Sequence, residues 1–196
     1  MTSSPHPLRH VSPKVLTGKK VLIPLGPDFE DREVVYPYYR FQEAGASVTL
    51  AGIGATQYQG KYGLPLQVNA QCEALIHEPW DIIMVPGGWA PDKMRMNQAL
   101  LDIIQATHEN PHAVIASICH GGWVLTSARI IQGRRVTSYC AIKDDLVFAG
   151  GLWEDAPVVI DTTPNKAKLV TSRHPADLAL FGEAILSCFA YEIHRS

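Results

Sequence analysis

Short apolar runs, rich in β-branched residues, recur along the chain and alternate with segments of helical periodicity. Four of these runs lie at 19–25, 46–52, 81–88 and 112–119, and each is nearly continuous in apolar residues. Strands that are covered by helices on both faces have this composition, because neither side of the sheet meets water. The alternation therefore predicts an α/β fold with a mostly parallel sheet.

The segments between these runs carry the helices that such a sheet needs. Residues 31–45 and 97–110 repeat apolar side chains at helical spacing, and they end at a glycine and just before a proline, respectively. Pro37 lies inside the first pattern and is expected to displace the start of the helix or to kink it. Later segments predict a hairpin beside the main sheet at 56–68, a short helix at 143–151, a strand pair at 157–172 and a closing helix at 175–190.

The composition is that of one soluble globular domain, and it argues against several classes of partner. The chain has 196 residues, of which 46% are hydrophobic and 18% charged, and its formal charge of -2 comes without a basic stripe. Nucleic acid and acidic membrane surfaces require such a stripe, so a small-molecule partner is expected instead. No apolar run approaches the roughly 18 residues of a membrane span. The polar start of the chain does not resemble a secretory signal.

The chain is expected to hold one domain with free thiols. We assign residues 1–17 to a loose N-terminal tail, residues 18–193 to the domain and residues 194–196 to a C-terminal tail. The cysteines are widely scattered and lack the spacing of metal-binding fingers. Reduced cysteines in a cytoplasmic protein are the expected state.

The sequence SICHGG, residues 117–122, predicts a nucleophile on a tight strand-to-helix turn. Ligands of an open parallel sheet settle at the carboxyl ends of its strands, and Cys119 follows the fourth strand. A strained turn and a close approach of substrate need small neighbours, which Ser117, Gly121 and Gly122 provide. The thiol would lie at a helix amino terminus, where the dipole favours thiolate. Cys119 and His120 can cooperate only if the cysteine lies just outside the helix, because adjacent helical residues do not face each other.

Structural roles are the alternative for each of these residues. A cysteine in an apolar strand is most often part of the core, which is the expectation for Cys72 and Cys188. His120 can simply open a helix, and Glu30 can be an ordinary loop acid. The small residues around Cys119 and the histidine that follows it favour a reactive thiol at that position.

A series of motifs resembles the PfpI intracellular protease family, a branch of the DJ-1/PfpI superfamily with a class I glutamine amidotransferase-like fold. In chain order the motifs read FEDREVVYPYYRFQEAG, GKYG, VPGGWAPDKMRMN, ASICHG, GRRVTSY, IKDDL and TSRHPADL. They extend from about residue 18 to residue 191. The resemblance implies a flavodoxin-like three-layer sandwich with a nucleophile elbow, and it is more specific for fold than for substrate.

The resemblance also implies roles for individual residues. The reactive cysteine of the family falls on Cys119 and the histidine that follows it on His120. The acid that hydrogen-bonds the thiol falls on Glu30, and the oxyanion-hole amides fall on Gly88 and His120. A further acid, which reaches the histidine from a neighbouring subunit, falls on Asp92, where a glutamate is expected. This arrangement implies a homodimer or a higher homo-oligomer.

Five further residues are expected at the pocket. Gly87 belongs to the glycine pair after the third strand, and Gly121 follows the histidine. The bulky side chain of Trp89 is expected to narrow the site against folded polypeptide. Tyr139 and His174 lie in the motifs GRRVTSY and TSRHPADL.

Two classes of function fit these residues. The first is a cysteine-dependent enzyme that acts on small reactive carbonyl compounds or on amide bonds. For this class the resemblance implies glyoxalase-like conversion of methylglyoxal to lactate, deglycase activity or peptidase activity, in stress protection, and we favour the small carbonyl compounds. The second is a non-catalytic redox-sensing stress protein or holdase that uses oxidation of Cys119.

No metal or cofactor is expected, because HExxH, GxGxxG and P-loop patterns are absent from the sequence. A second thiol, Cys140, stands where the family has a proline. If its Cα lies within about 7 Å of that of Cys119, it can resolve a sulfenic acid as a disulfide. The alternative is a packed thiol too distant to react.

Overall fold

The computed structural model describes residues 14–190. The C-terminal tail predicted at 194–196, and the predicted N-terminal tail up to residue 13, lie outside the described residues. Residues 14–17 do not extend that tail, because Leu16 is fully buried in the core and its N–H donates to the carbonyl of Ala44 at 2.9 Å. The domain therefore begins earlier than the sequence indicated.

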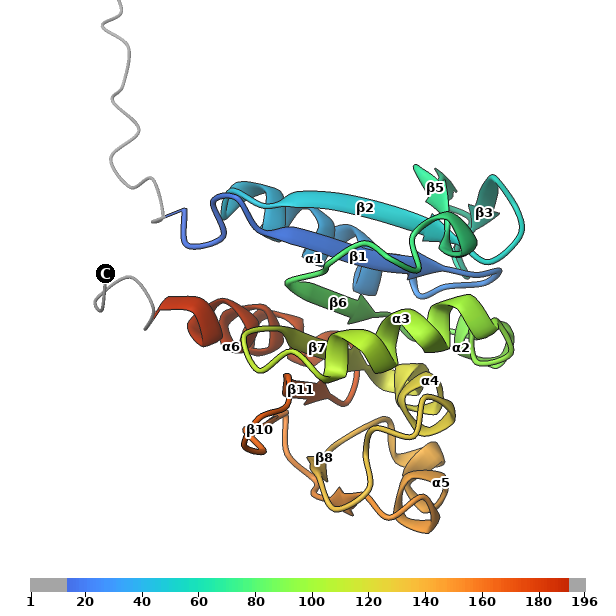
Figure 1. Ribbon diagram of the computed structural model, residues 1–196. Helices are drawn as coiled ribbons and strands as arrows, with labels where there is room; N and C mark the ends of the chain where they lie inside the picture. The colour runs from blue at the N-terminus through green and yellow to red at the C-terminus, as the bar shows by residue number, and fades with distance from the viewer. Residues whose placement is uncertain (1–13, 191–196) are drawn as a thin grey trace, which may run out of the picture.

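A seven-stranded sheet runs through the middle of the molecule (Figure 1). Its strand order is β10-β11-β7-β6-β1-β2-β5, and all neighbours are parallel except β10 and β11. This confirms the predicted α/β fold with a mostly parallel sheet. The strands are β1 (Lys20–Leu25), β2 (Ser47–Gly52), β5 (Ala70–Gln71), β6 (Ile82–Val85), β7 (Val114–Ile118), β10 (Val158–Asp161) and β11 (Lys168–Ser172).

Helices cover both faces of the sheet, which explains why β6 and β7 are buried at every residue. α1 (Asp31–Glu43) and α6 (Leu178–Ala190) pack against each other on one face. On the other face, α4 (Gly122–Ser127) contacts both α2 (Ala90–Met94) and α3 (Gln98–His108). Right-handed crossovers require this division, because β1 connects to β2 in one direction along the sheet and β6 connects to β7 in the opposite direction.

Pro37 does not displace the start of α1. The helix begins at Asp31 and continues through the proline to Glu43. Proline removes one intrahelical hydrogen bond, but Val34 and Phe41 on the same helix are buried against the core. Their burial holds the helix in place, so of the two effects expected from Pro37, displacement of the helix start does not occur.

Smaller elements flank the two ends of the sheet. β3 (Gln57–Gln59) and β4 (Pro65–Gln67) form the predicted hairpin beside the main sheet. At the other end, α5 (Lys143–Phe148) accompanies a parallel pair that the sequence did not predict, β8 (Arg135–Val136) and β9 (Leu152–Trp153) (Figure 1). Short 3₁₀ turns occur at η1 (Cys72–Ala74), η2 (Cys119–Gly121), η3 (Cys140–Ile142) and η4 (Pro175–Asp177).

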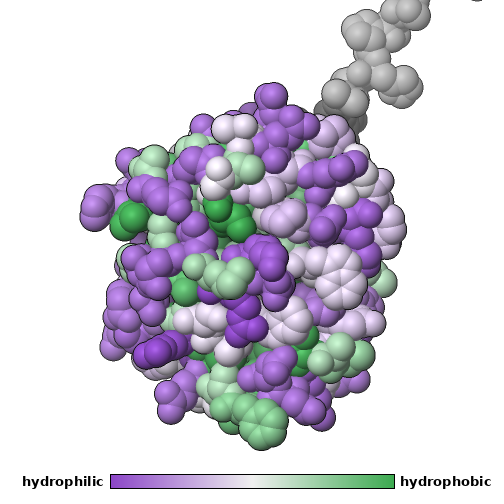
Figure 2. Space-filling view, turned by 90° about the vertical axis from the view of Figure 1, so that its right-hand side faces the viewer, coloured by the Kyte–Doolittle hydropathy of each residue, from purple (hydrophilic) through white to green (hydrophobic). Residues whose placement is uncertain are grey.

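The surface is mixed in polarity. On the face shown in Figure 2, hydrophilic residues surround small, separated hydrophobic patches. Within residues 14–190, no helix has the length and apolar character needed to cross a membrane.

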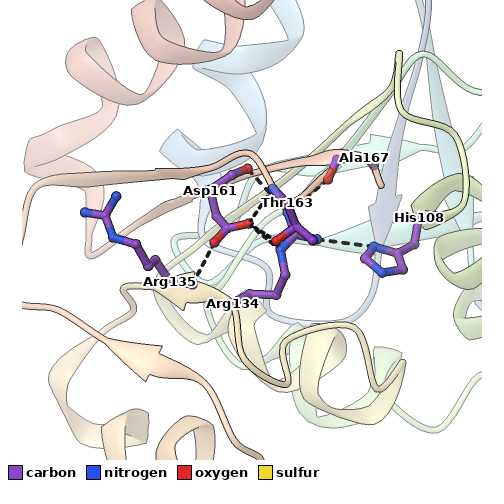
Figure 3. A network of polar contacts seen from close by, with 6 residues as sticks. All are labelled: His108, Arg134, Arg135, Asp161, Thr163 and Ala167. Atoms are coloured by element: carbon purple, nitrogen blue, oxygen red, sulfur yellow. Dashed lines mark hydrogen bonds and ion pairs between the residues drawn. The ribbon is translucent and has the colours of Figure 1, made fainter. Parts of the chain in front are cut away.

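A buried ion pair joins Arg134, just before β8, to Asp161, the last residue of β10 (Figure 3). The Arg134 guanidinium donates to the Asp161 carboxylate and, at 3.0 Å, to the carbonyl of Ala167. Asp161 also accepts the backbone N–H of Arg135 at 3.0 Å and the hydroxyl of Thr163 at 2.8 Å. Burial alone would raise the pKa of Asp161, but these donors together lower it.

Replacing Arg134 by methionine should lower the free energy of unfolding by about 3 kcal/mol near neutral pH, because it leaves a buried carboxylate unpaired. The depressed pKa of Asp161 makes this contribution present above about pH 4 and progressively lost as the pH falls further. Urea unfolding of the wild type and of R134M across this pH range measures both effects. Equal unfolding midpoints near neutral pH would show that the pair does not stabilise the fold.

Candidate active site

Three strand ends meet at the centre of the carboxyl edge of the sheet. The order β7-β6-β1 places the segments after these strands side by side. The connections that follow β1 and β6 leave toward opposite faces of the sheet, so the strand order reverses between these two strands. Such a reversal opens a crevice at the carboxyl edge. A pocket of about 340 Å³ lies there. Its lining residues are Glu30, Arg32, Glu33, Lys61, Tyr62, Gly88, Trp89, Cys119, His120, Tyr139, His174 and Pro175.

Cys119 occupies a strained turn between β7 and α4. Its φ angle is 60°, in the left-handed region that non-glycine residues rarely adopt. The turn has no room for larger neighbours. A Cβ on Gly121 would lie 2.7 Å from the carbonyl oxygen of Val85, and a Cβ on Gly87 would lie 2.7 Å from the Cβ of Cys119. This is the tight strand-to-helix turn that the sequence predicted.

His120 contacts the thiol from the next position in the chain. Its Nδ1 lies 3.3 Å from Sγ of Cys119, which is possible because the positive φ places the cysteine outside the regular helix. The imidazole stacks on Tyr139 with ring centroids 5.1 Å apart and packs near Trp89 and Trp123. Burial, and next the charge of Lys61, lower the pKa of His120. A neutral imidazole can accept the proton of the thiol.

The acid that shifts the pKa of the thiol is Glu33, whereas the resemblance implied Glu30 as the acid at the thiol. Glu33 is fully buried in the first turn of α1, and its Oε2 accepts the N–H of Gly87 at 2.7 Å. Glu30 precedes the helix, lines the pocket and pairs with Nε of Arg32 at 2.7 Å. Because α1 begins at Asp31, its buried face includes residue 33 and excludes residue 30.

A signal for Glu33 was present in the sequence. The residue shares the buried face of α1 with Val34, Pro37 and Phe41, at helical spacing. A carboxyl group on the apolar face of an amphipathic helix is rarely an ordinary solvated charge. The position of Glu33 on the buried face of α1 therefore distinguishes it from Glu30, which precedes the helix.

Burial controls the ionisation of both acidic partners. It raises the pKa of Glu33 to about 8, so that the carboxyl is protonated at neutral pH and can donate to sulfur. Burial, and next negative charge on Glu33, raise the pKa of the Cys119 thiol to about 12. Hydrogen bonds from the N–H groups of His120 and Gly88 act in the opposite direction. The helix terminus alone therefore does not set the ionisation of this thiol, because desolvation opposes these donors.

The two amides predicted for an oxyanion hole, those of Gly88 and His120, both lower the pKa of the Cys119 thiol. Gly88 has a φ of 78°, and a Cβ there would lie 2.4 Å from the backbone nitrogen of Glu30. Only glycine fits this position, where the loop after β6 contacts the loop after β1. Two fixed N–H donors beside the nucleophile are suited to negative charge developing on a substrate oxygen.

The remaining predicted residues divide between the pocket and the surface. Trp89, Tyr139 and His174 line the pocket. Asp92 lies in α2, pairs with Lys93 at 2.9 Å and is absent from the lining of the pocket in its own chain. Cys140 is exposed. It follows Tyr139, whose N–H donates to the Cys119 carbonyl at 3.2 Å.

Three further residues that line the pocket were not predicted from the sequence. They are Arg32, Lys61 and Tyr62.

Replacing Glu33 by glutamine should speed alkylation of Cys119 by iodoacetamide several-fold at about pH 9, because it removes the negative charge that opposes thiolate formation. Glu30→Gln is the matched control and should have little effect, since Arg32 already neutralises Glu30. Rates would be measured in a Cys140→Ser background by mass spectrometry. A faster rate in the Glu30 variant alone would assign the thiol contact to that residue instead.

Asp92 can act on His120 only from a second chain, so we expect at least a homodimer. Asp92→Asn and Cys119→Ser should each be inactive alone, and mixing them should restore activity by bringing intact residues together in mixed oligomers. Sedimentation would give the size of the active species. An active monomer would contradict the expectation.

Comparisons with known proteins agree with this fold and site. The sequence model of the DJ-1/PfpI family matches residues 19–188. Deglycase PfpI of Pyrococcus furiosus is 37% identical over 161 residues, which cover 81% of this chain and 92% of that protein. General stress protein 18 of Bacillus subtilis is 33% identical over 173 residues, covering 87% and 97%. The crystal structure of Drosophila melanogaster DJ-1beta is 25% identical with a TM-score of 0.79, covering 88% and 90%. The chain therefore belongs to the DJ-1/PfpI family.

Proposed function

We propose that the chain is a cysteine-dependent enzyme that acts on small reactive carbonyl compounds. The proposal is carried by the contact of 3.3 Å between Sγ of Cys119 and Nδ1 of His120 on a strained turn that faces a pocket. The names of two relatives, a deglycase and a general stress protein, support a role in protection from reactive compounds.

The first step is addition of the thiol to the carbonyl carbon. His120, neutral because its pKa is lowered, takes the thiol proton as the carbon–sulfur bond forms. The carbonyl oxygen becomes an oxyanion beside the amides of Gly88 and His120. The carboxyl of Glu33, held by Gly87 and protonated at neutral pH, adds no negative charge near the sulfur and so limits the cost of charge there.

With methylglyoxal, the proposed product is lactate. Thiol addition to the aldehyde gives a hemithioacetal, and a proton then moves from the aldehyde carbon to the neighbouring ketone carbon. The aldehyde carbon is thereby oxidised to a thioester while the ketone is reduced to an alcohol. Water hydrolyses the thioester and regenerates the thiol, so the net reaction adds one water and needs no external oxidant.

The dimensions of the pocket favour small compounds over polypeptide. A volume of about 340 Å³ is at the lower end for ligand pockets. Trp89 remains 56% exposed and Tyr139 38% exposed, and both line this pocket. Two rigid rings at the pocket leave little room for a folded protein chain.

Replacing Cys119 by serine should abolish lactate formation from methylglyoxal, by at least about a thousandfold, because serine cannot supply a comparable nucleophile. The fold should remain, with a free energy of unfolding within about 1 kcal/mol of the wild type. Lactate release would be followed by mass spectrometry, with glycated amines and peptides as parallel substrates. Exclusive peptide cleavage would establish a peptidase. Absence of any Cys119-dependent product, together with stoichiometric sulfinic acid at Cys119, would favour the redox sensor.

A further inference from the structure

Charge in the pocket is balanced except at one lysine. Arg32 and Glu30 form an ion pair at 2.7 Å, and the buried Glu33 carboxyl is protonated at neutral pH. His174 lies 3.6 Å from the carboxylate of Asp177. Lys61, also in the lining, makes no ion pair with any residue in the range 14–190. An unpaired cation is therefore left in a pocket whose other charges are compensated.

The backbone holds Lys61 at this position. Its N–H donates to the carbonyl of Phe29 at 2.8 Å, which ties the turn between β3 and β4 to the segment after β1. The Asp31 carboxylate accepts the N–H groups of Tyr62 at 2.9 Å and Leu64 at 3.1 Å. These bonds anchor the hairpin turn on both sides of the lysine. A loop anchored in this way presents its side chain with a small loss of entropy on binding.

Aromatic rings orient the ammonium group of Lys61. Its Nζ lies 5.5 Å from the ring centroid of Trp89 and 5.6 Å from that of Tyr62, and both rings line the pocket. Cation–π contacts stabilise the charge without neutralising it. The positive field reaches the reacting groups, because Lys61 is one of the causes that lower the pKa of His120.

We infer that Lys61 is a specificity-determining residue that binds a carboxylate on the substrate, so that the preferred carbonyl compounds are anionic. The inference rests on the proposed function for the identity of the reacting carbonyl. It adds that a 2-oxoaldehyde bearing a carboxylate is a better substrate than an equally long neutral one. An anionic substrate supplies a counter-charge for Lys61, which is exposed to solvent and has no ion-pair partner within residues 14–190.

The first test compares two alkylating agents of nearly equal size in a Cys140→Ser background. Iodoacetate carries a carboxylate and iodoacetamide is neutral, and both alkylate Cys119. Lys61→Met should lower the ratio of the iodoacetate rate to the iodoacetamide rate about three- to fivefold. Any change in thiol ionisation affects both reagents equally and leaves the ratio unchanged. Lys61→Arg should retain the ratio within about twofold, because it keeps the charge.

A matched control comes from another lysine beside a tryptophan. Lys143 lies 5.0 Å from the ring centroid of Trp153 and is not in the lining of the pocket. Lys143→Met removes the same charge and the same kind of contact, and it should leave the ratio unchanged. An equal fall in both methionine variants would assign the effect to overall charge and overturn the inference.

The second test uses turnover of 4,5-dioxopentanoate and of its methyl ester, which differ in the carboxylate. Wild-type kcat/KM should be about three- to fivefold higher for the acid, and Lys61→Met should remove this preference, which is measured as the ratio of the two kcat/KM values. If both compounds are consumed equally well, the inference fails and the proposed function stands. If neither is consumed, the proposed function fails. The alkylation ratio then decides the inference by itself, an unchanged ratio in Lys61→Met refuting it.

Discussion

The burial of the Glu33 carboxyl close to Cys119 is the constraint on which the site depends. It brings together the segments after β1 and β7, and the hydrogen bond from the Gly87 N–H to Glu33 adds the segment after β6. A carboxyl group without exposure to solvent is tolerated only with a donor and in its neutral form, which the raised pKa provides. Protonation of Glu33 therefore serves both the stability of the core and the reactivity of the sulfur.

Close packing around Glu33 and Cys119 restricts which residues can occupy the neighbouring positions. Gly87 and Gly88 have backbone or catalytic atoms within 3 Å of any added Cβ, and Gly121 is confined by Val85 and Ser117. Cys119 itself adopts a positive φ. The surrounding sheet, buried along β6 and β7, supplies the rigid support that keeps such a strained residue in place.

Loops outside the central strands determine which substrate groups can bind near the nucleophile. The hairpin turn carries Lys61 and Tyr62 to the pocket, and the segment after β11 contributes His174 and Pro175. These elements lie outside the central strands that create the crevice. A common fold can therefore hold one reactive thiol while different loops select different substrates.

The local sequence was sufficient to predict the sheet, the hairpin and the tight turn at Cys119. Continuous apolar runs are a direct consequence of burial on both faces, and small residues around a nucleophile follow from the lack of space. It did not identify Glu33 over Glu30, because the choice depends on where α1 begins and which of its faces meets the core. Nor did it show that Lys61 lines the same pocket as His120, or that burial raises the pKa of the Cys119 thiol. Those properties arise from charges and desolvation contributed by segments far apart in the chain, and only the tertiary structure brings these segments together.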